Sequence, residues 1–215
     1  MTDQRRPFFD EPDEKTWERS RQRWIWGQPA PQLTWGKRIK GDAFIAKAKA
    51  HGAFGHDKSI LEIGPGYGRL LMACFDLEIP FARYVGVDIA PANVEYLSKT
   101  FIDPRVHFIH GDIETIDLPG KFDAVLSSLT LKHLYPTFEK AMVNLARQLN
   151  PGAVVVFDLI EGEKAYFEQD AATYLRWYSK DEVRGILSSA GLDLKAFEVV
   201  QHDPEYSRLL VVARR

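Results

Sequence analysis

The feature that most constrains the fold is a regular alternation of short apolar runs and helix-like segments that begins at Ser59. The runs are SILEIG, YVGVDI, VHFIHGD, FDAVLSS and AVVVFDLI, and their length and β-branched content suit strands that are buried on both faces. Between them, GRLLMACFDL, PANVEYLSKTF and PTFEKAMVNLARQL carry apolar residues at helical spacing, and Pro91 and Pro136 stand where the first turn of a helix is expected. This alternation predicts an α/β fold, with a doubly wound, mostly parallel sheet covered by helices on both faces.

The C-terminal part of the chain ends this alternation. LKAFEVV and YSRLLVVAR are separated by the turn-prone HDPEY, so we expect a final antiparallel pair at the edge of the sheet. Before them, SKDEVRGILSSAG predicts a helix with Ser179 as its N-cap and Glu182 completing a capping box. Residues 160–178 read as an insertion on the acceptor side, whose aromatic residues either line a small-molecule pocket or only pack against the sheet; they are Tyr166, Phe167, Tyr174, Trp177 and Tyr178.

The first 55 residues differ from the rest. They hold four of the five tryptophans, and their apolar periodicity is patchy until GDAFIAKAKAHG, which predicts a short helix closed by Gly52. We therefore predict a Trp-rich N-terminal arm over residues 1–55 and a single core domain over residues 56–215. The arm either packs on the core through its tryptophans or covers a ligand pocket, and the sequence leaves both possibilities open; the four tryptophans are Trp17, Trp24, Trp26 and Trp35.

Composition excludes several classes of protein. A formal net charge of −2 over 215 residues gives no reason to expect a nucleic-acid partner, whose binding domains are usually basic. No apolar run approaches the ~18–20 residues that cross a bilayer, and MTDQRRPFFDEPDEK lacks the apolar stretch of a signal peptide, so no membrane association is expected. The single cysteine, Cys74, cannot form an internal disulfide and fits a reducing compartment. We expect a cytoplasmic protein.

A glycine-rich turn, LEIGPGYGR, lies where the first strand gives way to the first helix. Glycines at Gly64, Gly66 and Gly68 let the backbone turn sharply and let a ligand approach the main chain. Asp88 ends the next strand, twenty-four positions after Gly64, where a carboxylate can accept hydrogen bonds from both hydroxyls of a ribose. Glu62 beside the turn would repel a pyrophosphate but suits a ligand with an ammonium and a sulfonium, such as S-adenosylmethionine; it either touches the ligand or supports the loop.

Five segments in order resemble the motifs of the class I S-adenosylmethionine-dependent methyltransferases of the small-molecule type. They are LEIGPGYGRLL, VGVDIAPANVEYL, FIHGDIETI, FDAVLSSLTLKHL and LNPGAVVVFD, and together they cover about Ser59 to Leu159. The resemblance implies a Rossmann-like seven-stranded sheet with a reversed last strand, with Asp88 on the ribose and Asp112 on the adenine amino group. Gly-Asp at 111–112 is also an ordinary turn, so a purely structural role stays open. The implied cofactor-binding set is Glu62, Gly64, Pro65, Gly66, Gly68, Asp88, Ile89, Asp112, Ile113 and Ser128.

The fourth motif bears on the acceptor. Enzymes of the family that methylate amino groups of nucleobases and glutamine often carry Asn/Asp-Pro-Pro-Tyr/Phe there, whereas this chain has Ser127-Ser128-Leu129-Thr130. We therefore expect a small-molecule acceptor, methylated at oxygen, with S-adenosylhomocysteine as the second product. His133 follows and is a candidate general base, although it could equally pack or hydrogen-bond at a helix start.

Other functions remain open at this point. The histidines show no metal-ligand spacing and no tight Asp-Asp-Asn cluster follows AVVVFDLI, so no metal is expected. The alternatives are a protein or RNA methyltransferase that uses the arm for docking, and a non-catalytic protein that binds the cofactor, because a fold does not fix a function. The sequence leaves the oligomeric state undetermined.

Overall fold

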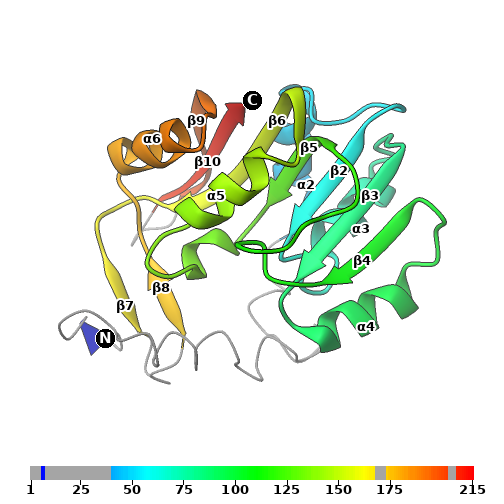
Figure 1. The fold of residues 1–215 in the computed structure, drawn as a ribbon, viewed down its shortest axis with the longest axis horizontal. Coiled ribbons are helices and arrows are strands. Elements are labelled where there is room, and N and C mark those ends of the chain that lie inside the picture. The colour runs from blue at the N-terminus through cyan, green and yellow to red at the C-terminus, as the bar shows by residue number, and fades with distance from the viewer. Residues whose placement is uncertain (1–5, 8–39, 168–172, 203–206) are drawn as a thin grey trace.

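A seven-stranded sheet forms the centre of the molecule (Figure 1). The structure is a computed structural model that describes residues 6–7, 40–167, 173–202 and 207–215. The strands run in the order β4-β3-β2-β5-β6-β10-β9 across the sheet. Their bounds are β2 Ser59–Ile63, β3 Arg83–Asp88, β4 Val106–His110, β5 Phe122–Ser127, β6 Leu149–Ile160, β9 Asp193–His202 and β10 Ser207–Arg214.

The strand directions confirm the predicted fold class. β2 pairs in parallel with β3 and with β5, and the pairs β3–β4 and β5–β6 are parallel as well. β10 is antiparallel to both of its neighbours, β6 and β9, so the last strand of the chain is the reversed one. Four of the five residues of β2 and five of the six residues of β5 are buried, as expected for strands covered on both faces.

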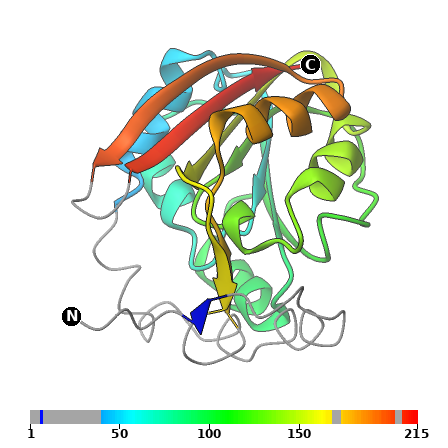
Figure 2. The ribbon, with the colours of Figure 1, turned by 90° about the vertical axis from the view of Figure 1, so that its left-hand side faces the viewer.

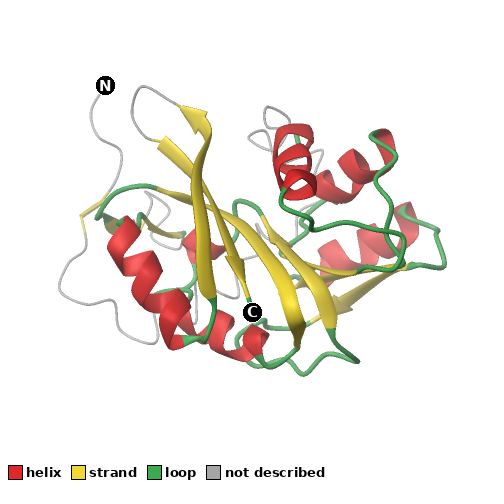
Figure 3. Cartoon of the chain, turned by 90° about the horizontal axis from the view of Figure 1, so that it is seen from above, coloured by secondary structure: helices red, strands yellow, loops and turns green. Residues whose placement is uncertain are grey.

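Helices cover both faces of the sheet, as the view from above shows (Figure 3). α5 and α6 contribute to the apolar core on one face, and α2 and α3 contribute to the core on the other face. α4 packs beside the sheet edge formed by β3 and β4. The bounds are α2 Asp42–Ala50, α3 Arg69–Asp76, α4 Pro91–Thr100, α5 Glu139–Ala146 and α6 Lys180–Ser189.

The helix signals in the sequence are confirmed at three positions and wrong at one. Pro91 is in the first turn of α4, the Ser179 side chain accepts a hydrogen bond from the Glu182 backbone N–H, and Gly52 closes α2 with φ +81°. The prediction that Pro136 starts a helix is wrong, because α5 begins only at Glu139. The Pro136 carbonyl instead accepts hydrogen bonds from the Tyr174 hydroxyl and the Arg176 guanidinium, which hold this segment against the insertion.

The insertion forms a separate small sheet that projects from the main one (Figure 2). β7 Ala165–Phe167 and β8 Tyr174–Arg176 are antiparallel, and β1 Arg6–Pro7 from the N-terminal arm pairs with β7. The four tryptophans of the arm lie outside the described residues, so the division into arm and core stays a prediction. None of the helices that the structure describes has the length and apolar character needed to span a membrane.

The strand order determines where a site can lie. After β2 the chain adds β3 and β4 on one side of β2, and then crosses to add β5 and β6 on the other side. The loops that follow β2 and β5 therefore diverge toward opposite faces of the sheet. In open α/β sheets, ligands bind in the crevice that this reversal creates at the carboxyl ends of the strands.

The buried sheet core supports a direct test. Val156 in β6 is fully buried, whereas Val143 on α5 is 42% exposed. Val156→Ala should lower the free energy of unfolding by about 2 kcal/mol, because it removes two buried methyl groups and leaves a cavity. Urea unfolding followed by circular dichroism measures the change. The same substitution at Val143 is the control and should change stability by less than about 0.5 kcal/mol; equal effects at the two positions would contradict the assigned core.

Candidate functional site

A cavity opens at the carboxyl ends of β2, β3, β4 and β5, where the strand order reverses. Its walls come from the loops after these four strands and from the first turn of the helices that follow. Of the predicted site residues, those on the wall are Glu62, Gly64, Pro65, Gly66, Asp88, Ile89, Asp112, Ile113, Ser128 and His133.

The glycine-rich turn forms one wall of the cavity. Gly64 and Gly66 have φ values of +66° and +57°, a region that side chains with a Cβ rarely adopt. A Cβ on Gly64 would lie 2.4 Å from Thr130 Oγ1, whereas a Cβ on Gly66 would meet nothing within 4 Å. The Gly66 backbone is therefore open to the cavity, and a ligand can approach it.

Gly68 is the one predicted site residue that does not line the cavity. It precedes α3 with φ +86°, and a Cβ there would lie 2.4 Å from the Phe101 ring. Glycine at this position allows the close packing of α3 against the end of α4.

Asp88 is fixed at the end of β3 by three hydrogen bonds. Its Oδ2 accepts from the Gly66 backbone N–H at 3.0 Å, and its Oδ1 accepts from the Ala90 N–H at 2.9 Å and from Asn93 Nδ2 at 3.2 Å. The residue is 5% exposed, and burial raises the pKa of Asp88 above its usual range, against the lowering effect of these hydrogen bonds. The carboxylate thus joins the glycine turn to the start of α4 and presents a fixed acceptor to the cavity.

Glu62 is a buried carboxyl group at the base of the cavity. Its Oε2 accepts a hydrogen bond from the Tyr84 hydroxyl at 2.6 Å. Burial raises the pKa of Glu62 to about 7, although the Tyr84 hydrogen bond and the charge of Arg69 both lower it. Near neutral pH this group therefore exchanges readily between its neutral and charged forms, and a cation in the cavity would favour the charged form.

The far end of the cavity is partly apolar. Ile113 is buried and Ile89 is 37% exposed, and both side chains contribute to the wall. Between them in the chain, Asp112 follows β4, and its Oδ1 accepts a hydrogen bond from the Glu114 N–H at 3.0 Å. Two aliphatic side chains beside a carboxylate form a setting that suits a flat heterocycle with an exocyclic amino group.

His133 ends the short 3-10 helix η4, Leu131–His133, and lies on the wall of the cavity. Its Nδ1 lies 2.7 Å from the backbone carbonyl oxygen of Tyr174 in β8. Because a carbonyl only accepts, Nδ1 carries the proton in the neutral ring and Nε2 is the basic nitrogen. This tautomer is the one that a general base at Nε2 requires.

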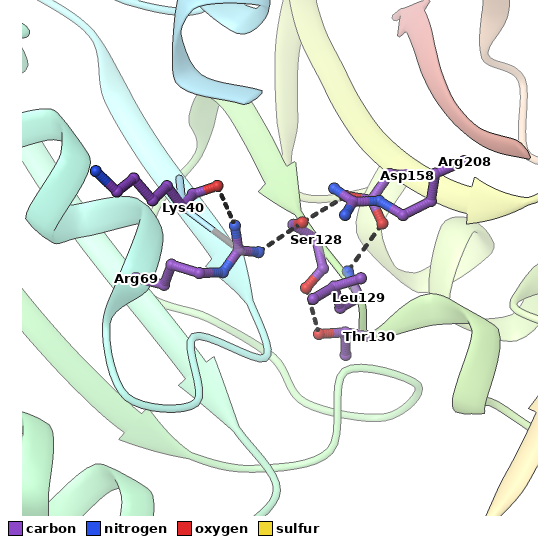
Figure 4. Close-up of polar contacts among 7 residues, drawn as sticks. All are labelled: Lys40, Arg69, Ser128, Leu129, Thr130, Asp158 and Arg208. Atoms are coloured by element: carbon purple, nitrogen blue, oxygen red, sulfur yellow. Dashed lines mark hydrogen bonds and ion pairs between the residues drawn. The ribbon is translucent and has the colours of Figure 1, made fainter. Parts of the chain in front are cut away.

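Several residues of the site were not predicted from the sequence. Arg69, Asn93, Leu129 and Thr130 line the cavity, and behind the wall the buried Asp158, which is paired with Arg208, accepts a hydrogen bond from the Leu129 N–H (Figure 4). Two signals could have revealed the pair. Asp158 interrupts the apolar run AVVVFDLI, and Arg208 stands within YSRLLVVAR, and charged residues in buried strands are rare unless they are paired.

The charges around the cavity are mostly acidic. Glu62, Asp88, Asp112 and Glu114 are on the wall, and the cationic or basic side chains there are Arg69 and His133. An excess of carboxylates disfavours a pyrophosphate and favours a ligand that carries positive charge. No group of three or more histidine, cysteine or acidic side chains suited to a metal ion occurs in the part of the chain that the structure describes.

The raised pKa of Glu62 gives a prediction about stability. The folded state favours the neutral form of Glu62. The contribution of this group to the free energy of unfolding is therefore largest below pH 4.5 and is lost as the pH rises toward about 7. Glu62→Gln should remove up to about 3 kcal/mol of this pH dependence. Urea unfolding of both proteins between pH 4 and pH 8 measures it. Parallel curves for the two proteins would show that Glu62 does not titrate in this range.

Comparison with known proteins agrees with this geometry. Residues 61–157 match the family model described as "Methyltransferase domain". The crystal structure of the Burkholderia thailandensis 1,6-didemethyltoxoflavin-N1-methyltransferase, with bound 1,6-didemethyltoxoflavin and S-adenosylhomocysteine, superposes with a TM-score of 0.80 at 19% identity, over 100% of this chain and 97% of that one.

Curated relatives are similar over part of their length. The fatty-acid O-methyltransferase of Mycolicibacterium smegmatis is 30% identical over 50% of this chain and 42% of its own. The malonyl-[acyl-carrier protein] O-methyltransferase of Priestia megaterium is 31% identical over 48% of this chain and 37% of its own. The chain thus spans less than half the length of these two relatives. The fold and the motif order agree with those of the class I S-adenosylmethionine-dependent methyltransferases, and the matched family model covers slightly less than half of the residues of this chain.

Proposed function

We propose that this protein transfers the methyl group of S-adenosylmethionine to an oxygen atom of a small-molecule acceptor and releases S-adenosylhomocysteine. The observation that carries the proposal is the acid-rich cavity at the reversal of the strand order, with a histidine on its wall whose tautomer suits a base. Two of the curated relatives are named as O-methyltransferases, which supports oxygen as the acceptor atom.

The residues present fit this cofactor. Asp88 would accept hydrogen bonds from the ribose hydroxyls, and the open backbone at Gly66 lets the ligand lie against the turn. Ile89 and Ile113 would flank the adenine, with Asp112 accepting from its amino group. Glu62 supplies a carboxylate toward the cationic methionine end. When bound, the cofactor supplies a methyl group on a positively charged sulfur, which is an activated leaving group.

The chemistry left for the protein is alignment and proton removal. Methyl transfer is an in-line displacement, so the rate depends on holding the acceptor oxygen opposite the sulfur. A hydroxyl acceptor must also lose its proton, and we assign this step to Nε2 of His133, whose Nδ1–H is held by the Tyr174 carbonyl. A carboxylate acceptor has no proton to lose and needs only alignment.

We place the acceptor beside the insertion and the N-terminal arm. β8 holds His133 and the segment around Pro136, β8 pairs with β7, and β1 of the arm pairs with β7, so the arm reaches the insertion. The reducing cytoplasm is the compartment we propose, because the one cysteine, Cys74, is buried and unpaired.

The cofactor assignment is tested through Asp88. Asp88→Asn should weaken the binding of S-adenosylmethionine by about 1–3 kcal/mol, because it removes charge-assisted hydrogen bonds to the ribose. Isothermal titration calorimetry measures the affinity, with NAD as a comparison ligand. The matched control is Asp181→Asn, whose side chain is 91% exposed and far in sequence from the cavity. An unchanged affinity in the Asp88 variant, or preferential binding of NAD, would overturn the assignment.

The role of His133 is tested by turnover. His133→Gln should lower kcat at least about 100-fold on a hydroxylated acceptor while leaving the Kd for S-adenosylmethionine unchanged, because only the proton acceptor is lost. Release of S-adenosylhomocysteine, followed across a panel of phenols, alcohols, carboxylic acids and amines, measures the effect and identifies the acceptor atom.

The panel also separates the proposal from its rivals. Turnover on amines alone would replace oxygen by nitrogen as the acceptor. Turnover on RNA or protein with none on small molecules would refute the small-molecule acceptor. Binding of the cofactor without turnover on any class would favour a non-catalytic binding protein.

A further inference from the structure

Leu129 has a backbone conformation that its side chain does not favour. It lies in the loop after β5, at the wall of the cavity, with φ +66°. Residues with a Cβ rarely adopt this left-handed region, so neighbouring groups must hold the loop in place. The loop matters for the cavity because Ser128, Leu129 and Thr130 all line it.

The groups that hold the loop converge on one carboxylate behind the wall (Figure 4). Asp158 in β6 is 1% exposed and is not among the residues that line the cavity. Its Oδ1 accepts a hydrogen bond from the Leu129 backbone N–H at 3.0 Å. Its Oδ2 accepts from the Ser128 hydroxyl and, at 3.1 Å, from Nη2 of Arg208. Two consecutive loop residues are thus tied to a single buried side chain.

A second arginine completes the arrangement from the other side of the crevice. Arg69 in α3 donates from Nη2 to the Ser128 hydroxyl oxygen at 2.7 Å and from Nη1 to the Lys40 carbonyl at 3.2 Å. The Ser128 hydroxyl therefore accepts from Arg69 and donates to Asp158. This series of hydrogen bonds joins α3, which follows the glycine turn, to β5, β6 and β10 across the base of the cavity.

The conformation of Leu129 places the next residue against the glycine turn. The Thr130 hydroxyl donates to the Gly64 carbonyl at 3.3 Å, and the Thr130 side chain occupies the space that a Cβ on Gly64 would need. A change in the backbone at Leu129 would move Thr130 away from this contact. The two walls of the cavity are therefore held at a fixed separation through Leu129.

We infer that Asp158 is a positioning residue, which acts through Leu129 and Ser128 to hold the loop 128–130 against the glycine turn and so shapes the cofactor cavity. The inference rests on the proposed function, since it assumes that the cavity takes S-adenosylmethionine or S-adenosylhomocysteine. Without the carboxylate, the Leu129 N–H loses its acceptor, and Arg69 and Arg208 both face the Ser128 region without an anion between them.

The test is a double-mutant cycle on the affinity for S-adenosylhomocysteine, measured by calorimetry. Asp158→Asn should weaken binding about tenfold in the native background, because the amide has a single oxygen, for which the Arg208 guanidinium competes with the Leu129 N–H. In a Leu129→Gly background the same change should weaken binding by no more than about twofold, because glycine adopts a positive φ without a held N–H. Asp158→Glu takes the place of the asparagine variant in the cycle if the latter does not fold.

The matched control is Asp123→Asn at the opposite end of β5. Asp123 also accepts from a backbone N–H, that of Ser59 at 2.9 Å, and from a side chain, Asn150 Nδ2 at 2.7 Å. This variant should lower the urea midpoint of unfolding and leave the affinity for S-adenosylhomocysteine unchanged. Loss of stability and loss of affinity are thereby separated.

The outcomes distinguish the two proposals. If the native protein does not bind S-adenosylhomocysteine, the proposed function fails. If it binds and Asp158→Asn leaves the affinity unchanged, or weakens it equally in both backgrounds, Asp158 has no positioning role and the inference is overturned. The inference is supported if Asp158→Asn lowers the affinity about tenfold in the native background and this loss largely disappears in the Leu129→Gly background.

Discussion

The site depends on the place of β2 in the sheet, between β3 and β5, where the strand order reverses. Because the chain builds outward from β2 to β3 and β4, and then returns to lay β5 on the other side, the segments that leave β2 and β5 must separate. The separation leaves a crevice at the carboxyl ends of these strands, between the two diverging loops. Every polar group of the candidate site stands at this edge or is tied to it, so one topological constraint accounts for the location of the cavity and for the residues that can reach it.

Charge is the second constraint, because several ionisable groups are buried at the site or directly behind its wall. Taking a charge out of water is costly unless it is paired, and the structure deals with this cost in two ways. Asp158 is fully paired, with Arg208, the Ser128 hydroxyl and the Leu129 N–H around it. Glu62 is only partly compensated, and burial raises its pKa to about 7. An incompletely compensated carboxylate beside a cavity is where a cationic ligand contributes most.

Local patterns in the sequence predicted most of the fold. The β-branched runs gave the central strands and their parallel arrangement, and the glycine turn and Asp88 were identified because their spacing is local. Pro136 was misjudged because its partners, Tyr174 and Arg176, lie about forty residues away in the insertion. The pairing of Asp158 with Arg208 was missed for the same reason: fifty residues separate them, and only the antiparallel register of β6 and β10 brings them together. Gly68 was predicted to contact the ligand, yet it lies outside the cavity wall, and its constraints are a φ of +86° and the Phe101 ring at the end of α4.

The two halves of the site differ in how closely sequence determines geometry. The cofactor side relies on particular side chains, such as Asp88 and Asp158, whose replacement removes an acceptor directly. On the proposed acceptor side, His133 is held through a backbone carbonyl, that of Tyr174, so the tautomer depends on the course of β8 and not on which side chain stands at position 174. Side chains of the insertion can therefore vary without changing which nitrogen of His133 is basic. In a fold arranged in this way, the side chains of the insertion can differ while the orientation of the His133 ring, the proposed proton acceptor, stays the same.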